Sequence, residues 1–155
     1  MFVATKTHDW RHKEVPQCAD ASLRRLGIDT IDLYQLHWPN GSVPIAETMA
    51  DMEELVQQGK VRFLGLSNSA VKEFKPAQAT LRKCTIEANQ VRYGLVDRTI
   101  EGDVLPFARR EGVTVIAHSP LAHSFQKLQE TSVTCSGLPP TAGPSASGYA
   151  FTFNS

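Results

Sequence analysis

Short apolar runs alternate with amphipathic stretches along this chain, and that alternation constrains the fold more than any other feature. Runs rich in β-branched and other apolar residues begin near residues 2, 31, 61, 85 and 113. Between them, apolar residues recur at helical spacing, and the glycines Gly27, Gly59 and Gly112 stand where helices should end. Connections of this length suit the crossovers between parallel strands, whereas antiparallel hairpins need only a few residues. The sequence therefore predicts about five successive parallel βα units.

The boundaries of these units can be drawn from the same pattern. Strands are expected at residues 2–5, 31–36, 61–66, 85–89 and 113–117. Helices are expected at residues 13–26, 42–59, 71–81 and 103–110. In the second helix, Ser42 is the predicted N-cap and Pro44 belongs to the first turn. In the third, Pro76 is expected to interrupt the helix because proline cannot donate a backbone hydrogen bond.

Two architectures accommodate five successive βα units: an open doubly wound sheet, and part of a (β/α)8 barrel. A doubly wound sheet that binds a dinucleotide should carry Gly-x-Gly-x-x-Gly at a turn from strand to helix. None of the predicted turns has this pattern. The favoured fold class is therefore α/β, a partial TIM (β/α)8 barrel of about five parallel units followed by an irregular tail.

A polar residue stands at the carboxyl end of each predicted strand. Any one of them could be ordinary, since polar residues begin where buried strands stop. Together they predict a shared mouth, because the carboxyl ends of barrel strands face the active site. These residues are Lys6, His37, the pair Ser67 and Asn68, Gln90, and the pair His118 and Ser119.

The second strand gives the clearest example of this placement. It delivers His37 and Trp38 to its end, where Pro39 stops it. Side chains alternate between the two faces of a strand, so if His37 points toward the mouth, Tyr34 faces the helices and belongs to the core. Histidine changes charge near neutral pH, which suits chemistry at such a position.

Charge and cysteine content exclude several classes of function. The 16 Lys and Arg balance the 16 Asp and Glu, so no charged field would attract nucleic acid or a membrane surface. The 3 cysteines are far apart and form no CxxC pair, which argues against a disulfide framework or a zinc site. His8 and His12 have a metal-like spacing but lack a third ligand, so no metal is predicted. With no long apolar segment, the chain is expected to be cytoplasmic.

Six short motifs resemble the central part of the aldo-keto reductase family. They are Val-Ala-Thr-Lys at 3–6, Ser-Leu-Arg-Arg-Leu-Gly-Ile-Asp at 22–29, Ile-Asp-Leu-Tyr-Gln-Leu-His-Trp-Pro at 31–39, Gly-Lys-Val-Arg-Phe-Leu-Gly-Leu-Ser-Asn at 59–68, Asn-Gln-Val-Arg-Tyr at 89–93 and Ile-Ala-His-Ser-Pro-Leu-Ala at 116–122. They follow the order and spacing of the family. The resemblance implies a barrel segment from the family's third strand to its seventh, and a nicotinamide cofactor bound without a Rossmann fold.

The resemblance also implies catalytic roles. Lys6 matches the family's catalytic lysine and His37 its catalytic histidine, while Trp38 matches a wall of the substrate pocket. In the family, a tyrosine protonates the carbonyl oxygen as hydride leaves the cofactor, and the lysine lowers the pKa of that tyrosine. His37 would orient the carbonyl group of a small aldehyde or ketone.

Further residues match the family's cofactor site. Ser67, Asn68 and Gln90 correspond to the residues that hold the nicotinamide carboxamide, and their uncharged donors and acceptors suit that group. His118 stands where the family usually has an aromatic phenol that stacks on the ring; an imidazole stacks less extensively. The residues at the family's pyrophosphate loop are Ser119 and Leu121.

The chain also departs from the family. The family's aspartate and acidic tyrosine belong to its first two βα units, which have no counterpart here, and Tyr34, Tyr93 and Tyr149 are poorly placed to replace the tyrosine. From Thr131 onward the chain has no charged residue or histidine. We therefore expect an incomplete barrel domain at residues 1–122 and a low-complexity, disordered tail at residues 123–155. NADP is the expected cofactor and NAD remains open, because the family's residues for the 2′-phosphate have no match.

Two functions of different class follow. The first is a truncated NAD(P)H-dependent reductase of aldehydes and ketones with little activity alone. The second is a non-catalytic module, derived from a barrel, that binds cofactor or packs against another chain. Five strands cannot close an eight-stranded barrel, so self-association through the open edges is also expected.

Overall fold

The computed structural model describes residues 1–7, 14–39, 43–121 and 150–151. Several sequence-based expectations lie outside these ranges. They concern His8 and His12, the predicted Ser42 cap, Tyr149, and almost all of the segment 123–155, which was expected to be a tail. Within the described ranges, no helix is long and apolar enough to cross a lipid bilayer.

Six strands and five helical segments form the described structure. The strands are β1 (Ala4–Thr7), β2 (Ile31–Leu36), β3 (Val61–Ser67), β4 (Ile86–Arg92), β5 (Thr114–His118) and β6 (Ala150–Phe151). The helices are α1 (Val15–Leu26), α2 (Ile45–Gln57), α3 (Val71–Thr80), the short 3-10 helix η2 (Thr99–Gly102) and α4 (Val104–Glu111).

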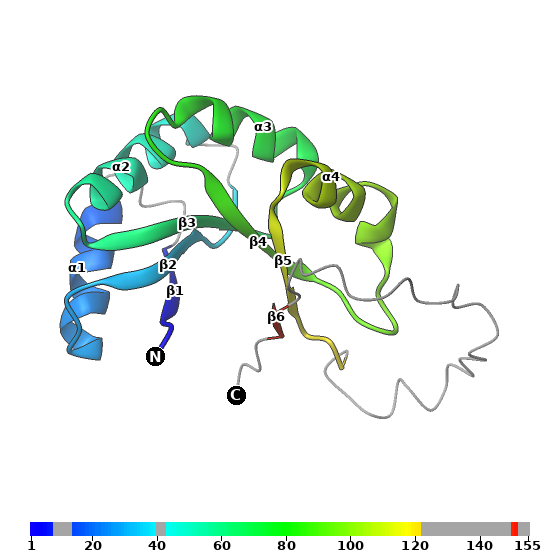
Figure 1. Ribbon diagram of the computed structural model, residues 1–155, viewed down its shortest axis with the longest axis horizontal. Helices are drawn as coiled ribbons and strands as arrows, with labels where there is room; N and C mark the ends of the chain where they lie inside the picture. The colour runs from blue at the N-terminus through cyan, green and yellow to red at the C-terminus, as the bar shows by residue number, and fades with distance from the viewer. Residues whose placement is uncertain (8–13, 40–42, 122–149, 152–155) are drawn as a thin grey trace.

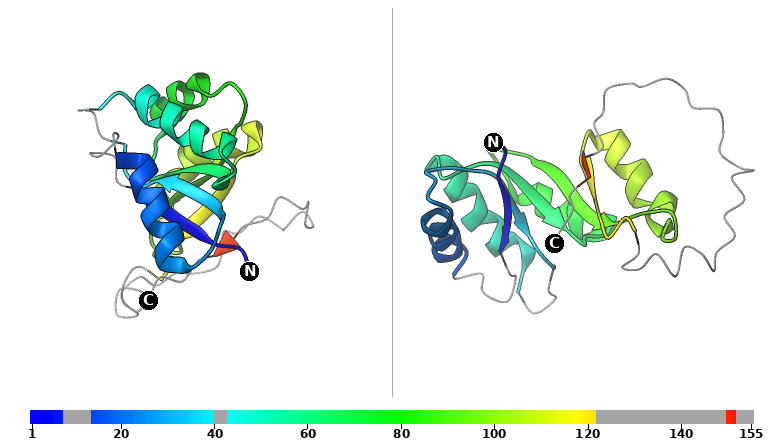
Figure 2. Two further views of the ribbon diagram at one scale, coloured as in Figure 1. Left: turned by 90° about the vertical axis from the view of Figure 1, so that its left-hand side faces the viewer. Right: turned by 90° about the horizontal axis from the view of Figure 1, so that it is seen from below.

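The strands form one parallel sheet in the order β1-β2-β3-β4-β5-β6. Each crossover advances to the next position in the same direction, so α1, α2, α3 and α4 form an arc over one face of the sheet (Figure 1). The views from the side and from below show the same one-sided cover (Figure 2). Because a doubly wound sheet would place helices on both faces, this arrangement confirms the predicted partial barrel.

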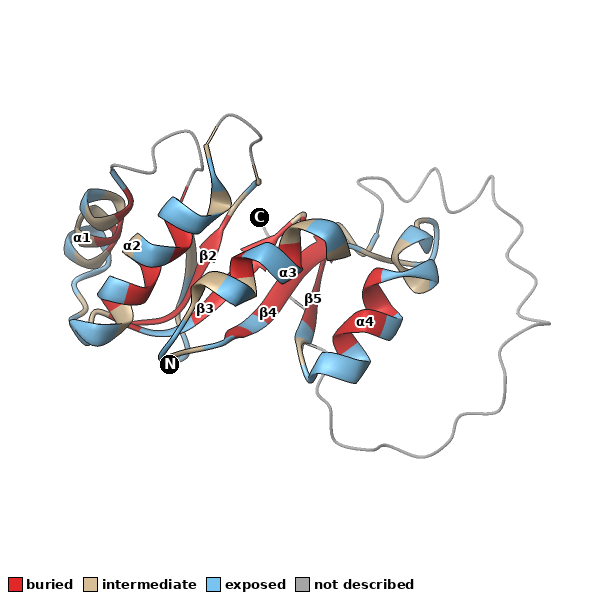
Figure 3. Ribbon diagram, turned by 90° about the horizontal axis from the view of Figure 1, so that it is seen from above, coloured by how far each residue is buried: buried red, intermediate tan, exposed pale blue. Residues whose placement is uncertain are grey.

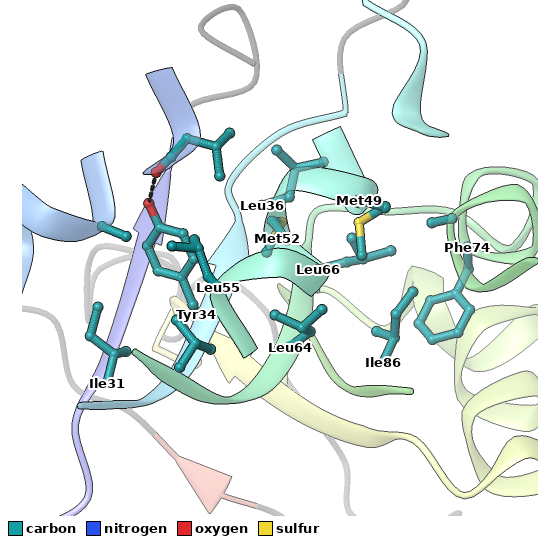
Figure 4. Close-up of a cluster of buried hydrophobic side chains, with 14 of the residues drawn as sticks. Ile31, Tyr34, Leu36, Met49, Met52, Leu55, Leu64, Leu66, Phe74 and Ile86 are labelled. Carbon is teal, nitrogen blue, oxygen red and sulfur yellow. Dashed lines mark hydrogen bonds between the residues drawn. The ribbon is translucent and has the colours of Figure 1, made fainter. Parts of the chain in front are cut away.

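The main core lies between the sheet and this arc of helices. The helix sides that face the sheet are buried, and the opposite sides are exposed (Figure 3). Tyr34 is fully buried there, beside Leu64 and Leu55, and its hydroxyl donates to the Val15 carbonyl at 3.4 Å (Figure 4). Burial raises the pKa of Tyr34 to about 12. The prediction that Tyr34 faces the helices is therefore confirmed.

A second, smaller core lies on the other face of the sheet. Leu33, Ala88 and Ile116 are buried there together. Gly65 lies between them, and a β-carbon at this position would be 3.0 Å from Gln35 Cγ and 3.1 Å from the Ala88 carbonyl oxygen. A glycine in this strand is therefore explained by close approach of its neighbours.

The helix α3 differs from the expectation, because it continues through Pro76 without a break. Its first turn is capped by the Glu73 carboxylate, which accepts from the Ala70 backbone N–H at 2.7 Å. Phe74 and Ala77 pack into the core on either side of the proline. The cap and this packing offset the hydrogen bond that proline cannot make.

Several element boundaries also differ from the prediction. The strand β2 ends at Leu36 as expected, but the other four expected strands extend further toward their carboxyl ends, so Lys6, Ser67, Gln90 and His118 lie within strands rather than after them. Parallel pairing explains the longer strands, because the hydrogen bonds between strands join backbone groups and do not depend on which side chain a residue has. Pro44 is the N-cap of α2 and not part of its first turn. The elements η2 and β6 were not expected.

The Glu53 carboxylate of α2 fixes the connection between α3 and β4. One of its oxygens accepts from the backbone N–H groups of Arg82 and Lys83, at 2.8 and 2.7 Å. The residue is only 8% exposed. The hydrogen bond from Lys83 is the main reason why the pKa of Glu53 is lowered.

We expect replacement of Glu53 by alanine to cost about 2 kcal/mol of unfolding free energy, since two backbone N–H groups lose a partly buried, charged acceptor. Because the pKa of Glu53 is lowered in the folded state, its contribution is full above its ordinary pKa and is lost as the pH falls through the folded value. Urea unfolding at pH 7 and at pH 4 measures both effects. Glu53→Gln keeps an acceptor oxygen and should lose less stability at pH 7; equal losses in the two variants would contradict this account.

The segments that follow β4 and β5 meet at Gly94. A β-carbon there would lie 2.3 Å from the Pro120 carbonyl oxygen, a distance that requires the backbone to move. By contrast, a β-carbon at Gly102 meets nothing within 4 Å.

Gly94→Ala should therefore destabilise the fold by about 1–3 kcal/mol, as overpacking of a tight contact usually does. Gly102→Ala is the matched control and should change stability by less than about 1 kcal/mol. Thermal unfolding of both variants compares the two positions. Equal melting temperatures would show that the contact between these segments is not tight.

Candidate active site at the carboxyl ends of the strands

Main-chain hydrogen bonds hold the carboxyl ends of the strands together. The His37 N–H donates to the Thr7 carbonyl at 2.9 Å, which joins the end of β2 to the end of β1. The Asn68 N–H donates to the Gln90 carbonyl at 2.8 Å, which joins the end of β3 to β4. The polar residues that the sequence places at these ends are thus brought to one edge of the sheet.

The side chain of Asn68 is the centre of a hydrogen-bond network at this edge. Its Nδ2 donates to the His37 carbonyl oxygen at 3.1 Å and to Ser67 Oγ at 3.1 Å. Its Oδ1 lies 3.0 Å from His118 Nε2. One amide therefore links the ends of β2, β3 and β5.

Two further contacts extend the network. Ser67 Oγ donates to the Gln90 carbonyl at 2.9 Å, and His118 Nδ1 lies 3.2 Å from Ser119 Oγ. Ser67 and Gln90 are 1% and 3% exposed, whereas His118 and Ser119 are partly exposed. Five of the predicted cofactor residues therefore form one connected group.

Two residues of this group have a backbone conformation that is uncommon outside glycine. Asn68 has φ of 55° and Ser119 has φ of 51°. Such conformations usually persist only where surrounding contacts hold them, and they cluster at functional sites. Here they aim the Asn68 amide and the Ser119 hydroxyl at His118.

Lys6 lies on the same face of the sheet as this group. It is in register with Gln35 of β2, two residues before His37. Its side chain is half-buried, and desolvation lowers the pKa of its ammonium. Within the described ranges, no carboxylate lies within ion-pair distance of it.

The remaining predicted residues lie at the rim. The Trp38 side chain is 53% exposed, and its ring centroid is 6.1 Å from that of His37. Leu121 is 42% exposed after the end of β5. Both therefore lie where they could contact a bound molecule, although neither belongs to the hydrogen-bond network.

Sequence reasoning missed Gln35. This side chain is 1% exposed, and its Nε2 donates to the Leu66 carbonyl at 3.2 Å. It lies between Lys6 and Gly65 in the register of the sheet. Gln35 is two residues before His37, so the two side chains point to the same face of the sheet. This alternation would have identified Gln35 as a neighbour of the site.

The donor groups at this edge of the sheet are uncharged apart from Lys6 and the imidazoles. No group of three or more His, Cys, Asp or Glu side chains in the described ranges is arranged to hold a metal ion. The donors that do converge are hydroxyl, amide and imidazole groups, which suit a polar organic ligand.

Comparison with known proteins identifies relatives of this architecture. The model of the "Aldo/keto reductase family" matches residues 1–134. Methylglyoxal reductase YeaE of Escherichia coli (strain K12) is 39% identical over 127 residues, which are 80% of this chain and 44% of that protein. Aldo-keto reductase YhdN of Bacillus subtilis (strain 168) is 37% identical over 135 residues, 81% of this chain and 40% of that protein.

Solved structures give the same result. The thermostable aldo-keto reductase Tm1743, in complex with the inhibitor epalrestat, matches with a TM-score of 0.76 at 33% identity, over 83% of this chain and 49% of that one. An aldo/keto reductase from Klebsiella pneumoniae in complex with NADP and acetate matches with a TM-score of 0.71 at 34% identity, over 79% of this chain and 44% of that one. The chain thus spans less than half the length of these relatives. It belongs to the aldo/keto reductase family.

Proposed function

We propose that this chain binds a nicotinamide dinucleotide at the carboxyl ends of β3, β4 and β5, as part of an NAD(P)H-dependent reduction of aldehydes or ketones to alcohols. The observation that carries the proposal is the network around Asn68, which presents hydroxyl, amide and imidazole groups from three strands at one edge.

The chemistry of the donor set fits the proposed cofactor. A nicotinamide carboxamide has an acceptor oxygen and a donor NH2 group, and Ser67, Asn68 and Gln90 offer complementary groups without a charge. The related structures from Klebsiella pneumoniae are complexes with NADP and with NADPH, which supports NADP as the cofactor; NAD is the alternative.

A small carbonyl compound is the proposed substrate. The Escherichia coli relative is a methylglyoxal reductase, which supports this class. His37 would donate a hydrogen bond to the carbonyl oxygen, Lys6 would add positive charge near it, and the exposed face of Trp38 would form an apolar wall. When bound, the nicotinamide supplies the hydride; the residues of this chain orient the two reactants.

A non-catalytic role is the second candidate, and the positions of the described tyrosines favour it. Tyr34 is buried in the core with a pKa raised to about 12. The Tyr93 hydroxyl donates to the Glu101 carboxylate at 2.8 Å. Neither is placed as a general acid at the mouth. We therefore propose that the chain binds cofactor but reduces carbonyl compounds slowly by itself.

Titration of the 155-residue chain with NADPH, followed by fluorescence, tests cofactor binding. We expect saturable binding that Gln90→Ala weakens by roughly tenfold, because a buried amide next to the carboxamide is lost. Gln58→Ala, at the exposed end of α2, is the matched control and should bind like the unaltered chain. The absence of binding at millimolar NADPH would contradict the proposed function.

The same samples test the choice between the two candidates. In the presence of methylglyoxal, the unaltered chain should oxidise NADPH no faster than the His37→Ala variant does. Appreciable oxidation that is lost in His37→Ala would instead support catalysis by the chain alone.

We also propose that a second copy of the chain covers the open edges of the sheet. In the described structure β1 pairs only with β2, and β6 pairs only with β5. Phe63, in register with the inward-facing Leu33, is 46% exposed. Unpaired strand edges favour association, and so does an exposed aromatic side chain on the same sheet.

Sedimentation analysis from 5 to 100 µM is expected to show dimers or larger species whose fraction rises with concentration. Phe63→Lys should shift this equilibrium toward the monomer, because it introduces charge on the inward face. A monodisperse monomer that melts cooperatively throughout this concentration range would contradict the proposal.

A further inference from the structure

The imidazole of His118 is the one titratable ring in the network around Asn68. Its Nε2 lies 3.0 Å from Asn68 Oδ1, and its Nδ1 lies 3.2 Å from Ser119 Oγ. We propose that His118 positions the Asn68 amide and that its protonation makes the site prefer the reduced nicotinamide over the oxidised one. This inference rests on the proposed binding of a nicotinamide dinucleotide.

The contacts of Asn68 determine which nitrogen of His118 carries the hydrogen. The His37 carbonyl can only accept, so the atom of Asn68 that faces it must be the donor Nδ2. The opposite atom, Oδ1, is then an acceptor, and His118 Nε2 must donate to it. Neutral His118 is therefore the Nε2–H tautomer, and its Nδ1 accepts from the Ser119 hydroxyl.

Protonation of His118 would leave this geometry intact. The added proton goes to Nδ1, which then donates to Ser119 Oγ instead of accepting from it. A hydroxyl serves either role by rotating. The bond to Asn68 Oδ1 has Nε2 as its donor in both states, so the ring keeps its position and only its charge changes.

The groups around His118 include charges of both signs. On the β4 side, Arg92 is in register with His118, and its Nε lies 3.2 Å from Asp97 Oδ2. The pKa of Asp97 is lowered mainly by hydrogen bonds from Thr99, and also by Arg92 and His118. The Asp97 carboxylate therefore favours the protonated ring, and Arg92 opposes it.

The other elements contribute less charge near His118. At the end of β3, Ser67 and Asn68 are uncharged. On β2, His37 is linked to His118 through Asn68, and Lys6 lies farther along the same face on β1. The segment paired with β5 on its other side, Ala150–Phe151, has no ionisable side chain. Tyr93, after β4, hydrogen-bonds the Glu101 carboxylate, and its backbone N–H donates to the His118 carbonyl.

The two forms of the nicotinamide differ in charge. The oxidised ring is a cation, whereas the reduced ring is neutral. A protonated imidazole at the residue that holds Asn68 would repel the cation and leave the neutral ring almost unaffected. As the pH falls, the affinity for the oxidised cofactor should therefore fall while the affinity for the reduced cofactor stays nearly constant.

Binding titrations of the full chain with NADP+ and with NADPH between pH 6 and pH 8.5 test this inference. A one-unit fall in the pKa of an imidazole from about 6.5, when the oxidised form binds, predicts that the ratio of the two dissociation constants, NADP+ over NADPH, rises about threefold from pH 8.5 to pH 6, toward a limit of about tenfold at lower pH. The 2′-phosphate titrates in both forms, so its effect largely cancels in the ratio. Proton NMR of the His118 ring gives the same pKa change directly.

Two variants separate the contribution of His118 from that of other groups. In His118→Tyr the ratio should be constant with pH, because a phenol stays neutral over this range. In Asp97→Asn the pH midpoint should move lower, because a negative charge that favours the protonated ring is removed.

The possible outcomes distinguish this inference from the function on which it rests. Binding of both forms with a ratio independent of pH would overturn the inference and leave the proposed function standing. A pH-dependent ratio that persists in His118→Tyr would overturn it too, and would indicate another group such as His37. Failure to bind either form would overturn the proposed function itself.

Discussion

Parallel pairing of consecutive strands is the constraint on which the rest of this structure depends. The chain must return to the same edge of the sheet before each new strand begins, and every step is to the next strand in the same direction, so α1, α2, α3 and α4 all lie on one face. The carboxyl ends of the strands then meet at one edge, whatever residues they carry. That meeting is why Lys6, His37 and His118, which are far apart in the sequence, lie along the same edge. The fold therefore determines which residues lie close together, and their side chains determine what the site can bind.

The network around Asn68 converts this proximity into a defined geometry. Asn68 and Ser119 have positive φ angles, which costs of order 1–3 kcal/mol each. Hydrogen bonds to the Gln90 and His37 carbonyls and to His118 hold Asn68 in that conformation. Because these partners come from different strands, the site forms only when the strand ends are aligned. The order of the site is therefore coupled to the integrity of the sheet.

The periodicity of the sequence was sufficient for the architecture, because helices and strands bury their apolar residues at different intervals. It was also sufficient for the orientation of Tyr34, which follows from the alternation of side chains along a strand. The same alternation places Gln35 on the face of His37, but it does not show that the Gln35 amide binds the Leu66 carbonyl. The expectation that Pro76 interrupts its helix was wrong, because packing of Phe74 and Ala77 outweighs a local helix-breaking preference. The network around Asn68 could not be predicted from periodicity, since it depends on side-chain geometry between strands.

Two of the contacts that fix the cofactor residues end on main-chain atoms. Asn68 holds the carbonyl of His37 and not its imidazole, and Ser67 holds the carbonyl of Gln90 and not its amide. A carbonyl is present at every position regardless of the residue there. Substitution at residue 37 can therefore change the chemistry offered to a substrate while the anchor for Asn68 remains. Such a division of labour lets one scaffold evolve new substrate preferences without rebuilding the part that would hold its cofactor.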